Sequence, residues 1–204
     1  MPPQDDTSPS DRRPHDAGNP SATAPGAADG PAASSPDHFT INDTIDAGVR
    51  VGHVHLKVAD LERSLRFYRD ILGFTVTRRR EGAAFMSAGG YHHHIAINTW
   101  QSAGGQPPPP GTTGLYHTAI LYPTRRLLAD ALRRLIAARI PLDGAADHGV
   151  SEALYLRDPD ENGVELYCDR PRAQWQYAAN GHIVMTSKPL DLRDLLAEID
   201  KPAT

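Results

Sequence analysis

The stretch VGHVHLKVADLERSLRFYRDILGF, residues 51–74, contains a strand pattern followed directly by a helix pattern. Its first part, 51–58, alternates along the chain and is rich in β-branched residues, which predicts a strand. Asp60 precedes apolar residues at helical spacing and Gly73 follows them, which predicts a capped helix over 59–74. Short strand candidates come next, near 74–80, 83–88 and 91–98. This order predicts one β-α-β-β-β unit.

The same order returns in the second half of the chain. A strand is predicted over 114–123, and an amphipathic helix over 124–139 with Thr124 as its cap. Three strand candidates follow, a short one within 140–149 and longer ones over 151–158 and 164–169. His53 and His117 occupy equivalent places in this internal repeat. Because two such units can close their sheets around a shared cleft, the expected fold class is α+β with two βαβββ modules.

Composition divides the chain into three parts. Residues 1–46 are rich in Pro, Ala, Gly, Ser and Asp and hold too few apolar residues for a core, which predicts a disordered tail. The paired modules are expected over 47–176. A C-terminal extension over 177–204 contains PLDLRDLLAEID, which predicts a short helix. Residues 99–114 are expected to form a loop, because four consecutive prolines exclude both helix and central strand.

Charge, hydropathy and cysteine content limit the cellular compartments and the classes of partner that we expect. The chain carries no apolar run at its start and no long apolar stretch, so we expect neither a signal peptide nor a membrane partner. The single cysteine, Cys168, cannot form an internal disulfide, which fits a reducing cytoplasm. A net charge of −4 gives no general reason to expect nucleic acid as a partner.

Two histidines and one glutamate are expected to meet in the cleft. His53 and His117 lie on the faces of the first strands that point away from the helices. In the last strand Val164 and Leu166 fit the helix side, so Glu165 is expected to point inward. A buried carboxylate is costly unless it meets a cation or hydrogen-bond donors. A lone strand histidine is typical of ordinary core or surface positions, but this set also matches a mononuclear non-haem iron(II) site.

Three segments resemble the vicinal oxygen chelate superfamily, namely HVHLKVADLERSLRFYRDILGF, LYHTAILYP and LRDPDENGVELYCDRP. The superfamily includes glyoxalase I, extradiol ring-cleaving dioxygenases and bleomycin-resistance proteins, and the resemblance covers roughly residues 50–176. Within it, YHHHIAINTW and ADHGVSEALYLRDPD are most similar to the catechol 2,3-dioxygenase branch. The resemblance implies Fe(II), with Mn(II) or another divalent metal possible, bound by His53, His117 and Glu165. His55 is the alternative to His53, which better matches the first position of HVHL.

The resemblance also implies further site residues. Glyoxalase-type members carry a glutamate ligand where this chain has Ala96, which cannot bind metal and disfavours a glyoxalase site. Extradiol members carry an acid–base histidine three residues earlier, which is His93 here, although a one-residue bulge would select His94 instead. Tyr155 and His148 match the groups that hold the substrate hydroxyl and assist ring opening. The other histidines of the run at 92–94 are expected to be structural or at the rim.

The implied function is cleavage of a catechol-like aromatic by iron(II) and dioxygen. Two alternatives remain open: a glyoxalase-type metal-dependent lyase or isomerase, and a non-catalytic protein that binds an aromatic drug. Drug-binding members typically lack the metal triad, but an incomplete substrate pocket would leave a binder. Familiar catechol 2,3-dioxygenases carry two pairs of these units and this chain carries one, so we expect a homodimer that completes the walls.

Overall fold

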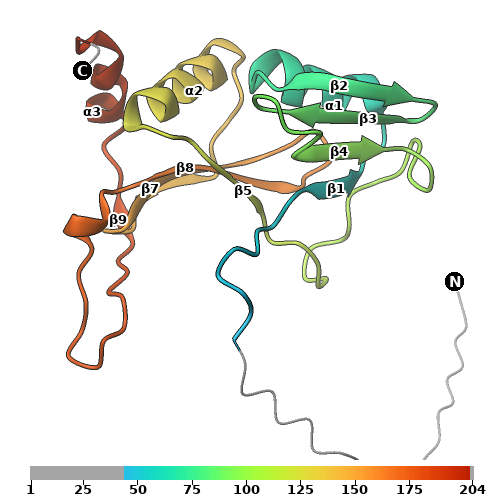
Figure 1. Cartoon of the computed structure of the whole chain (residues 1–204). Coiled ribbons are helices and arrows are strands. Elements are labelled where there is room, and N and C mark those ends of the chain that lie inside the picture. Colours follow the sequence, from blue (N-terminus) through green and yellow to red (C-terminus); the bar gives the residue numbers. More distant parts are fainter. Residues whose placement is uncertain (1–43, 203–204) are drawn as a thin grey trace, which may run out of the picture. The chain divides into compact units, whose positions relative to one another are not determined.

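The structure is a computed structural model that describes residues 44–202 (Figure 1). Residues from Gly48 onward form one compact unit. The disorder expected for residues 1–46 falls, apart from 44–46, outside the described residues. Over the described range, no helix has both the length and the apolar character needed to cross a membrane.

The first module has the expected order of one strand, a helical segment and three strands. Its elements are β1 (Val54–Lys57), α1 (Leu61–Leu65), the π-helix η1 (Arg66–Ile71), β2 (Thr75–Arg80), β3 (Ala83–Ser87) and β4 (Ile95–Asn98). The sheet order is β1-β4-β3-β2, and β1 runs parallel to β4. The first strand is therefore an edge strand that lies beside the last strand of its own module.

The second module repeats this topology. Its elements are β5 (Thr118–Leu121), α2 (Arg125–Ala137), β6 (Gly144–Asp147), β7 (Ser151–Arg157) and β8 (Gly163–Asp169). The sheet order is β5-β8-β7-β6-β9, with β5 parallel to β8. The added strand β9 (Lys188–Pro189) comes from the C-terminal segment and pairs antiparallel with β6. The α+β fold of two βαβββ modules is thus confirmed.

Both expected helix caps form. Asp60 Oδ1 accepts a hydrogen bond from the Arg63 N–H at 2.9 Å, at the start of α1. Thr124 Oγ1 accepts from the Leu127 N–H at 3.2 Å, at the start of α2. Each cap satisfies a main-chain donor that the first turn of a helix leaves free, so these residues fix where the helices begin.

The first helix differs from the regular helix expected over 59–74. From Arg66 onward its turns are wider, and the Leu72 N–H donates to the Phe67 carbonyl five residues back, at 3.0 Å. This wider winding brings Phe67 and Leu72 onto one face, where both are buried. Hydrophobic spacing alone did not predict this winding, because the choice between the two depends on how the segment packs.

A buried polar contact joins the two modules. In the turn between β7 and β8, Asp160 accepts hydrogen bonds from the Ala59 N–H at 2.9 Å and from Ser64 Oγ at 3.1 Å. Asp158 Oδ2 accepts from the Tyr68 hydroxyl at 2.8 Å. Burial, and after it the nearby Asp158, raises the pKa of Tyr68 well above its usual value. These contacts fix the first module against the second, and with it the relation of β1 to β5.

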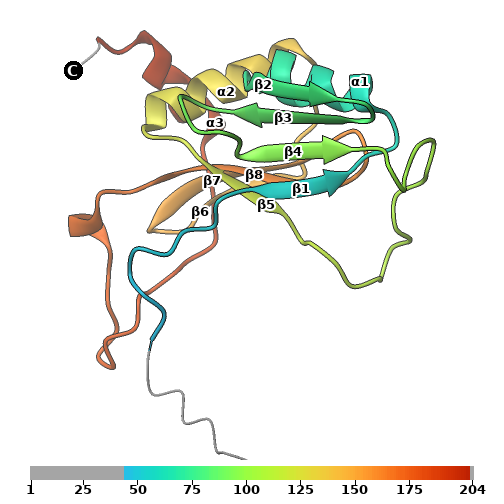
Figure 2. The ribbon, with the colours of Figure 1, turned by 45° about the vertical axis from the view of Figure 1, so that its right-hand side comes forward.

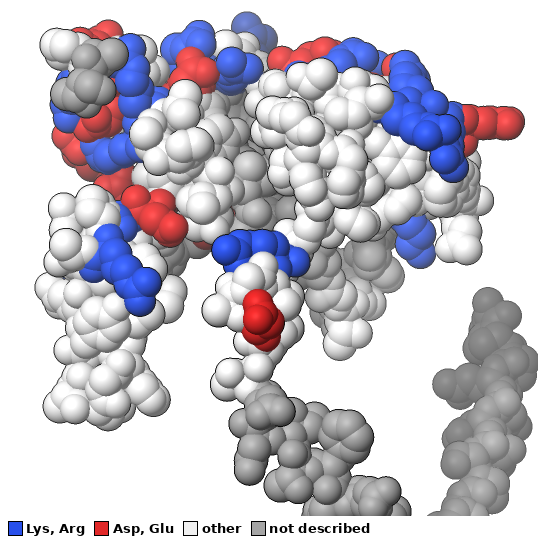
Figure 3. Space-filling model, viewed as in Figure 1, with Lys and Arg blue, Asp and Glu red and all other residues white. Residues whose placement is uncertain are grey.

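Helices α1 and α2 lie on the same side of the two sheets in both views (Figures 1 and 2). Buried apolar residues of both modules form one cluster, which includes Leu56, Leu65, Leu128, Leu154 and Leu166. Basic and acidic side chains mix over the helical side, whereas the region below it in Figure 3 carries few charges. The helices and the core therefore occupy one face of the sheets and leave the other faces of β1 and β5 for a site.

The chain after β8 returns to the second module. It contains a 3-10 turn η2 (Arg172–Gln174), β9, α3 (Leu192–Leu196) and a final 3-10 turn η3 (Ala197–Asp200). The helix expected within PLDLRDLLAEID is confirmed, and Asp191 caps it by accepting from the Arg193 N–H at 2.9 Å. Leu195 is fully buried and α3 packs on α2. We call residues 186–200 the C-terminal arm.

Candidate metal centre

The parallel strand pairs define equivalent positions in the two modules. In the first module His55 lies beside Ala96, and in the second Ala119 lies beside Glu165. Ala96 and Glu165 therefore occupy the same place in their sheets. The equivalence that the family resemblance implied for Ala96 is confirmed here, and of these two positions only that in the second module carries a carboxylate.

His117 and Glu165 lie together at the start of β5 and the middle of β8. His117 Nε2 is 2.9 Å from Glu165 Oε2, and the Glu165 side chain is 13% exposed. Two donor atoms bound to one ion at about 2.1 Å each and at a right angle lie about 3 Å apart. The separation of this pair therefore fits two neighbouring ligands of one metal ion.

Tyr155 extends this pair on the neighbouring strand. Tyr155 and Glu165 are direct cross-strand partners in the β7–β8 ladder, and the Tyr155 hydroxyl donates to Glu165 Oε1 at 3.0 Å. Burial, followed by the charge of Glu165, raises the pKa of Tyr155 to about 12. Tyr155 therefore keeps its hydroxyl proton throughout the physiological pH range.

His148 continues the chain of contacts. Its Nε2 lies 2.7 Å from the Tyr155 hydroxyl, and its Nδ1 lies 2.8 Å from the Thr186 carbonyl oxygen. Because a carbonyl oxygen can only accept, Nδ1 must be the donor. The structure thus joins four residues predicted from the sequence, His117, Glu165, Tyr155 and His148, in one continuous polar chain.

Two cavities border these residues. The β7 cavity, of about 390 Å³, is lined by His117, His148 and Tyr155 among others. The β1–β5 cavity, of about 640 Å³, lies along the two edge strands and is lined by both His53 and His117. Since His117 lines both cavities, the His117–Glu165 pair stands where a small molecule in either cavity could approach it.

The donor set fits a metal ion at two of its three predicted positions. No three His, Cys, Asp or Glu side chains of residues 44–202 lie close enough together to hold a metal ion. The structure brings together His117 and Glu165, and it leaves His53 exposed on the wall of the cavity that it shares with His117. Imidazole and carboxylate are suitable donors for a divalent ion of the iron type. The His53 ring would have to turn toward the pair to complete the set.

The histidine run lies before β4 and not within it. The strand expected over 91–98 begins only at Ile95. The His93 ring lies 4.4 Å from that of His53 and 5.2 Å from that of Phe85, measured between ring centroids. Burial, and after it His53, lowers the pKa of His93. His93 is therefore the member of the run that contacts the predicted ligand of the first module.

The other two histidines of the run have different neighbours. His94 Nδ1 accepts from the Ala88 N–H at 3.3 Å and lies 3.1 Å from Ser87 Oγ. His94 also lines the β1–β5 cavity. The Nδ1 atom of the exposed His92 lies 2.7 Å from that of His93. The three rings of the run therefore have different surroundings. His93 lies against His53, His94 contacts Ser87 and Ala88, and His92 is exposed.

His55, the alternative to His53, is engaged elsewhere. Its Nε2 accepts a hydrogen bond from Asn98 Nδ2 at 2.9 Å, and its ring lies near those of Phe85 and Trp100. Burial, and then the neighbouring His53, lowers the pKa of His55. Of the two histidines, His53 is the one that lines the β1–β5 cavity, which favours it as the ligand.

Thr186 is a site residue that the sequence did not indicate. It contacts His148 through its main-chain carbonyl, a group that every residue carries, so the residue type at position 186 could not indicate the contact. The short β9 that brings it there pairs only Lys188 and Pro189 with β6. A proline in a two-residue edge strand does not stand out in a sequence.

Two βαβββ modules paired around a cavity define the vicinal oxygen chelate fold. Residues 50–166, more than half of the chain, match the Glyoxalase/Bleomycin resistance protein/Dioxygenase superfamily, and the chain belongs to this family. A solved glyoxalase/dioxygenase from Nostoc punctiforme shares the fold, with a TM-score of 0.51 at 20% identity. That likeness covers 65% of this chain and all of the other.

Two curated relatives of this chain are dioxygenases. The chain is 43% identical over 155 residues to the Catechol-2,3-dioxygenase of Bacillus subtilis, covering 76% of this chain and 54% of that protein. It is 35% identical over 124 residues to Biphenyl-2,3-diol 1,2-dioxygenase 3 of Rhodococcus globerulus, covering 59% and 63%. The chain therefore spans between half and two thirds of the length of these relatives.

Proposed function

We propose that this chain is an extradiol dioxygenase that cleaves a catechol-like aromatic ring with dioxygen. The observation that carries the proposal is the chain of contacts from His117 through Glu165 and Tyr155 to His148. It combines two metal donors with two proton-handling groups beside a cavity of about 390 Å³. The similarity to a catechol dioxygenase and a biphenyl-diol dioxygenase supports the same reaction class.

His53, His117 and Glu165 would hold the metal, which we propose to be Fe(II), with Mn(II) or another divalent ion as the alternative. Such an ion would supply one coordination sphere in which the two catechol oxygens and dioxygen meet. Glu165 keeps its carboxylate oriented through the Tyr155 hydroxyl. A contact of this kind, made to a ligand by a neighbouring side chain, tunes metal affinity and geometry.

The remaining residues handle protons. Catechol must lose protons to bind through both oxygens, so a base of near-neutral pKa is useful at the cavity. The His148 Nδ1 proton is engaged by the Thr186 carbonyl, which leaves the Nε2 lone pair as the basic atom toward the cavity. Tyr155, which remains protonated, could give its one hydroxyl hydrogen to a substrate oxygen in place of Glu165 Oε1. His93 is the corresponding proton carrier beside His53.

The alternative reaction classes lack such support. A glyoxalase-type site needs a fourth ligand, and the equivalent position holds Ala96, whose methyl group cannot bind metal. A non-catalytic aromatic binder would not need a metal pair backed by Tyr155 and His148. We further propose a cytoplasmic setting, in which the buried free thiol of Cys168 stays reduced.

We also propose a homodimer. Edge strand β5 and its approach carry large apolar side chains that are exposed, namely Leu115, Tyr116 and Leu121. A second copy would cover them and complete the cavity walls. Light scattering of the full chain tests this, and a monomer at micromolar concentration would contradict it.

Anaerobic loading with Fe(II), followed by catechol or biphenyl-2,3-diol and then air, tests the reaction. The expected result is a yellow ring-opened product, a semialdehyde in the case of catechol, with one dioxygen consumed per ring. The same protein loaded with Zn(II), which cannot exchange electrons with dioxygen, is the matched control and should stay colourless. Tight binding of these diols without colour or oxygen uptake would replace the proposal with the aromatic-binding function.

A further inference from the structure

Thr186 holds His148 through main-chain groups on two sides. The Thr186 N–H donates to the His148 carbonyl oxygen at 2.9 Å, and His148 Nδ1 donates to the Thr186 carbonyl oxygen at 2.8 Å. A neutral imidazole with its hydrogen on Nδ1 has a lone pair on Nε2. That atom lies 2.7 Å from the Tyr155 hydroxyl, so His148 Nε2 and Glu165 Oε1 are two acceptors that compete for the one hydroxyl hydrogen. Thr186 therefore determines which nitrogen of His148 is available as a base.

The C-terminal arm carries Thr186 to this place and forms part of the cavity. Ser187, the next residue, lines the β7 cavity. Lys188 and Pro189 then add the arm to the free edge of β6, opposite Asp147 and Ala146. The arm is thus part of the wall against which a substrate in this cavity would lie.

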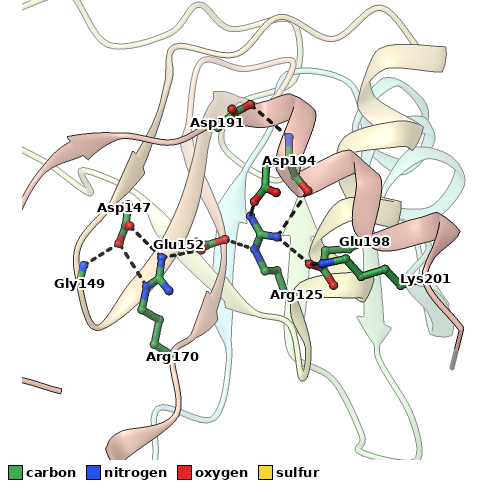
Figure 4. Close-up of polar contacts among 9 residues, drawn as sticks. All are labelled: Arg125, Asp147, Gly149, Glu152, Arg170, Asp191, Asp194, Glu198 and Lys201. Carbon is green, nitrogen blue, oxygen red and sulfur yellow. Dashed lines mark hydrogen bonds and ion pairs between the residues drawn. The ribbon is translucent and has the colours of Figure 1, made fainter. Parts of the chain in front are cut away.

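A network of ion pairs fastens the arm, and we call it the clasp (Figure 4). Its members are Arg125, Asp147, Glu152, Arg170, Asp194 and Glu198. Glu152 lies at its centre and is only 4% exposed. Its Oε2 accepts from Arg125 Nε at 2.6 Å, and its Oε1 accepts from Arg170 Nη2 at 2.7 Å. Both oxygens of this buried carboxylate are therefore paired, as burial of a charge requires.

The two arginines extend the clasp in opposite directions. Arg170 also donates to Asp147 Oδ2 at 2.8 Å, and Asp147 directly precedes the histidine that the arm contacts. Arg125 donates to Asp194 Oδ2 and to Glu198 Oε1, each at 2.8 Å, and both of these acids belong to the arm. One continuous set of ion pairs therefore connects the β6 end that carries His148 with the arm that holds its ring.

We propose that the C-terminal arm positions His148, with Thr186 as the positioning residue that selects the Nδ1-protonated tautomer and the clasp as its fastening. The proposal rests on the proposed function for the part that His148 plays in the reaction. The tautomer itself is a property of the metal-free protein, so it can be tested without any turnover.

The first test measures the His148 tautomer by ¹⁵N–¹H NMR of the metal-free full chain, at a pH where the ring is neutral. The resonances are assigned by comparison with His148→Ala. We expect the Nδ1–H form in the wild type and a mixture of both forms in the Asp194→Ala/Glu198→Ala double variant, which removes both side-chain ion pairs between the arm and Arg125. Asp130→Ala removes two ion pairs within α2, to Arg133 and Arg134, which are not part of the clasp, and should leave the tautomer unchanged. An Nε2–H wild type, or an unchanged double variant, would overturn the proposal.

The second test is a mutant cycle on turnover. The Asp194→Ala/Glu198→Ala double variant should have a kcat about tenfold lower than the wild type, as loss of a supporting contact commonly causes. The same two substitutions should lower kcat by less than about twofold in the His148→Ala background, because the arm is proposed to act on turnover through His148. Equal losses in both backgrounds would overturn the positioning role. If the double variant does not fold, Asp194→Asn, at a side chain 65% exposed, serves in both tests. Absence of wild-type turnover would count against the proposed function alone, since the tautomer result stands by itself.

Discussion

At equivalent positions of β4 and β8, the first module carries Ala96 and the second carries Glu165. The cross-strand partners of Ala96 are His55 and Phe85. Its own strand, β4, is buried along its whole length. Around Glu165 lie His117 and Tyr155, whose polar atoms contact both carboxylate oxygens. The same backbone therefore supports two different environments, and the cross-strand neighbours determine which of them can hold a charge.

The histidines divide in the same way. In the second module, His117 and His148 both belong to one polar chain that ends on the Thr186 carbonyl. In the first module, His53 and His93 contact each other as rings and have no carboxylate partner among the contacts described. The second module alone therefore brings an imidazole and a carboxylate into contact, and under the proposed function the first module would contribute one further ligand.

The largest effect is expected from Glu165→Ala, which makes the second module resemble the first. Loss of a direct ligand should lower metal affinity by more than about 100-fold and turnover by about 1000-fold or more, beyond the losses seen for supporting residues. Titration calorimetry with Fe(II) under nitrogen and oxygen uptake measure the two quantities. Glu81→Ala, at an exposed site, is the control. Retention of metal by Glu165→Ala would refute the ligand assignment.

The reverse change, Ala96→Glu, should destabilise the metal-free protein by about 3 kcal/mol, because a carboxylate enters a fully buried site without donors. Urea unfolding measures this, with the exposed Ala178→Glu as the control. If the two positions are equivalent, Zn(II) should restore part of the loss, since a ligand that binds only the folded state stabilises it. A loss that Zn(II) does not reduce would mean that Ala96 does not face the metal.

Tyr155→Phe removes the hydroxyl between Glu165 and His148 and keeps the ring. We expect turnover to fall by about 10- to 100-fold, with metal affinity changed far less than in Glu165→Ala. Because the pKa of Tyr155 is raised to about 12, the hydroxyl stays protonated up to about pH 11. Ultraviolet titration at 295 nm should accordingly lose one late-titrating tyrosine in this variant. A wild-type tyrosine that ionises near pH 10 at this position would contradict the buried contact.

Tyr68→Phe tests the contact that holds the modules together. Loss of the hydrogen bond to the buried Asp158 should lower the free energy of unfolding by about 1–2 kcal/mol. The raised pKa of Tyr68 means that its protonated form favours folding, so this stability is complete below about pH 10 and lost as pH rises further. Urea unfolding at pH 8 and above pH 10 measures both effects, with the exposed Tyr177→Phe as control. A variant that matches the control at pH 8 would show that the contact adds nothing.

The smallest effect is expected from His55→Gln. Its amide can still accept from Asn98, and His55 lines neither of the two cavities described, so turnover should stay within about threefold of wild type. The matched variant His53→Gln should lose most metal-dependent activity. The two variants are compared by steady-state oxygen uptake, and a reversed order of effects would exchange the ligand roles of the two histidines.

Much of the fold followed from local patterns. Asp60 and Thr124 cap their helices as expected, and the family resemblance implied the equivalence of Ala96 with Glu165. Helix caps depend on a few neighbouring residues, so the sequence carries them directly. The π-helical winding after Arg66 did not follow, because it depends on how the helix packs.

Taken alone, the sequence determined the two βαβββ modules, the imidazole and carboxylate at His117 and Glu165, and the alanine at the position equivalent to Glu165 in the first module. Only the tertiary structure decided that the ring of His93 and not that of His94 lies against His53, and that Thr186 holds His148. The physical reason is range: hydrophobic spacing and capping act over a few residues, whereas these contacts join separate elements through packing. For Thr186 the contact is also made by a main-chain carbonyl, which every residue type carries, so the sequence cannot indicate it.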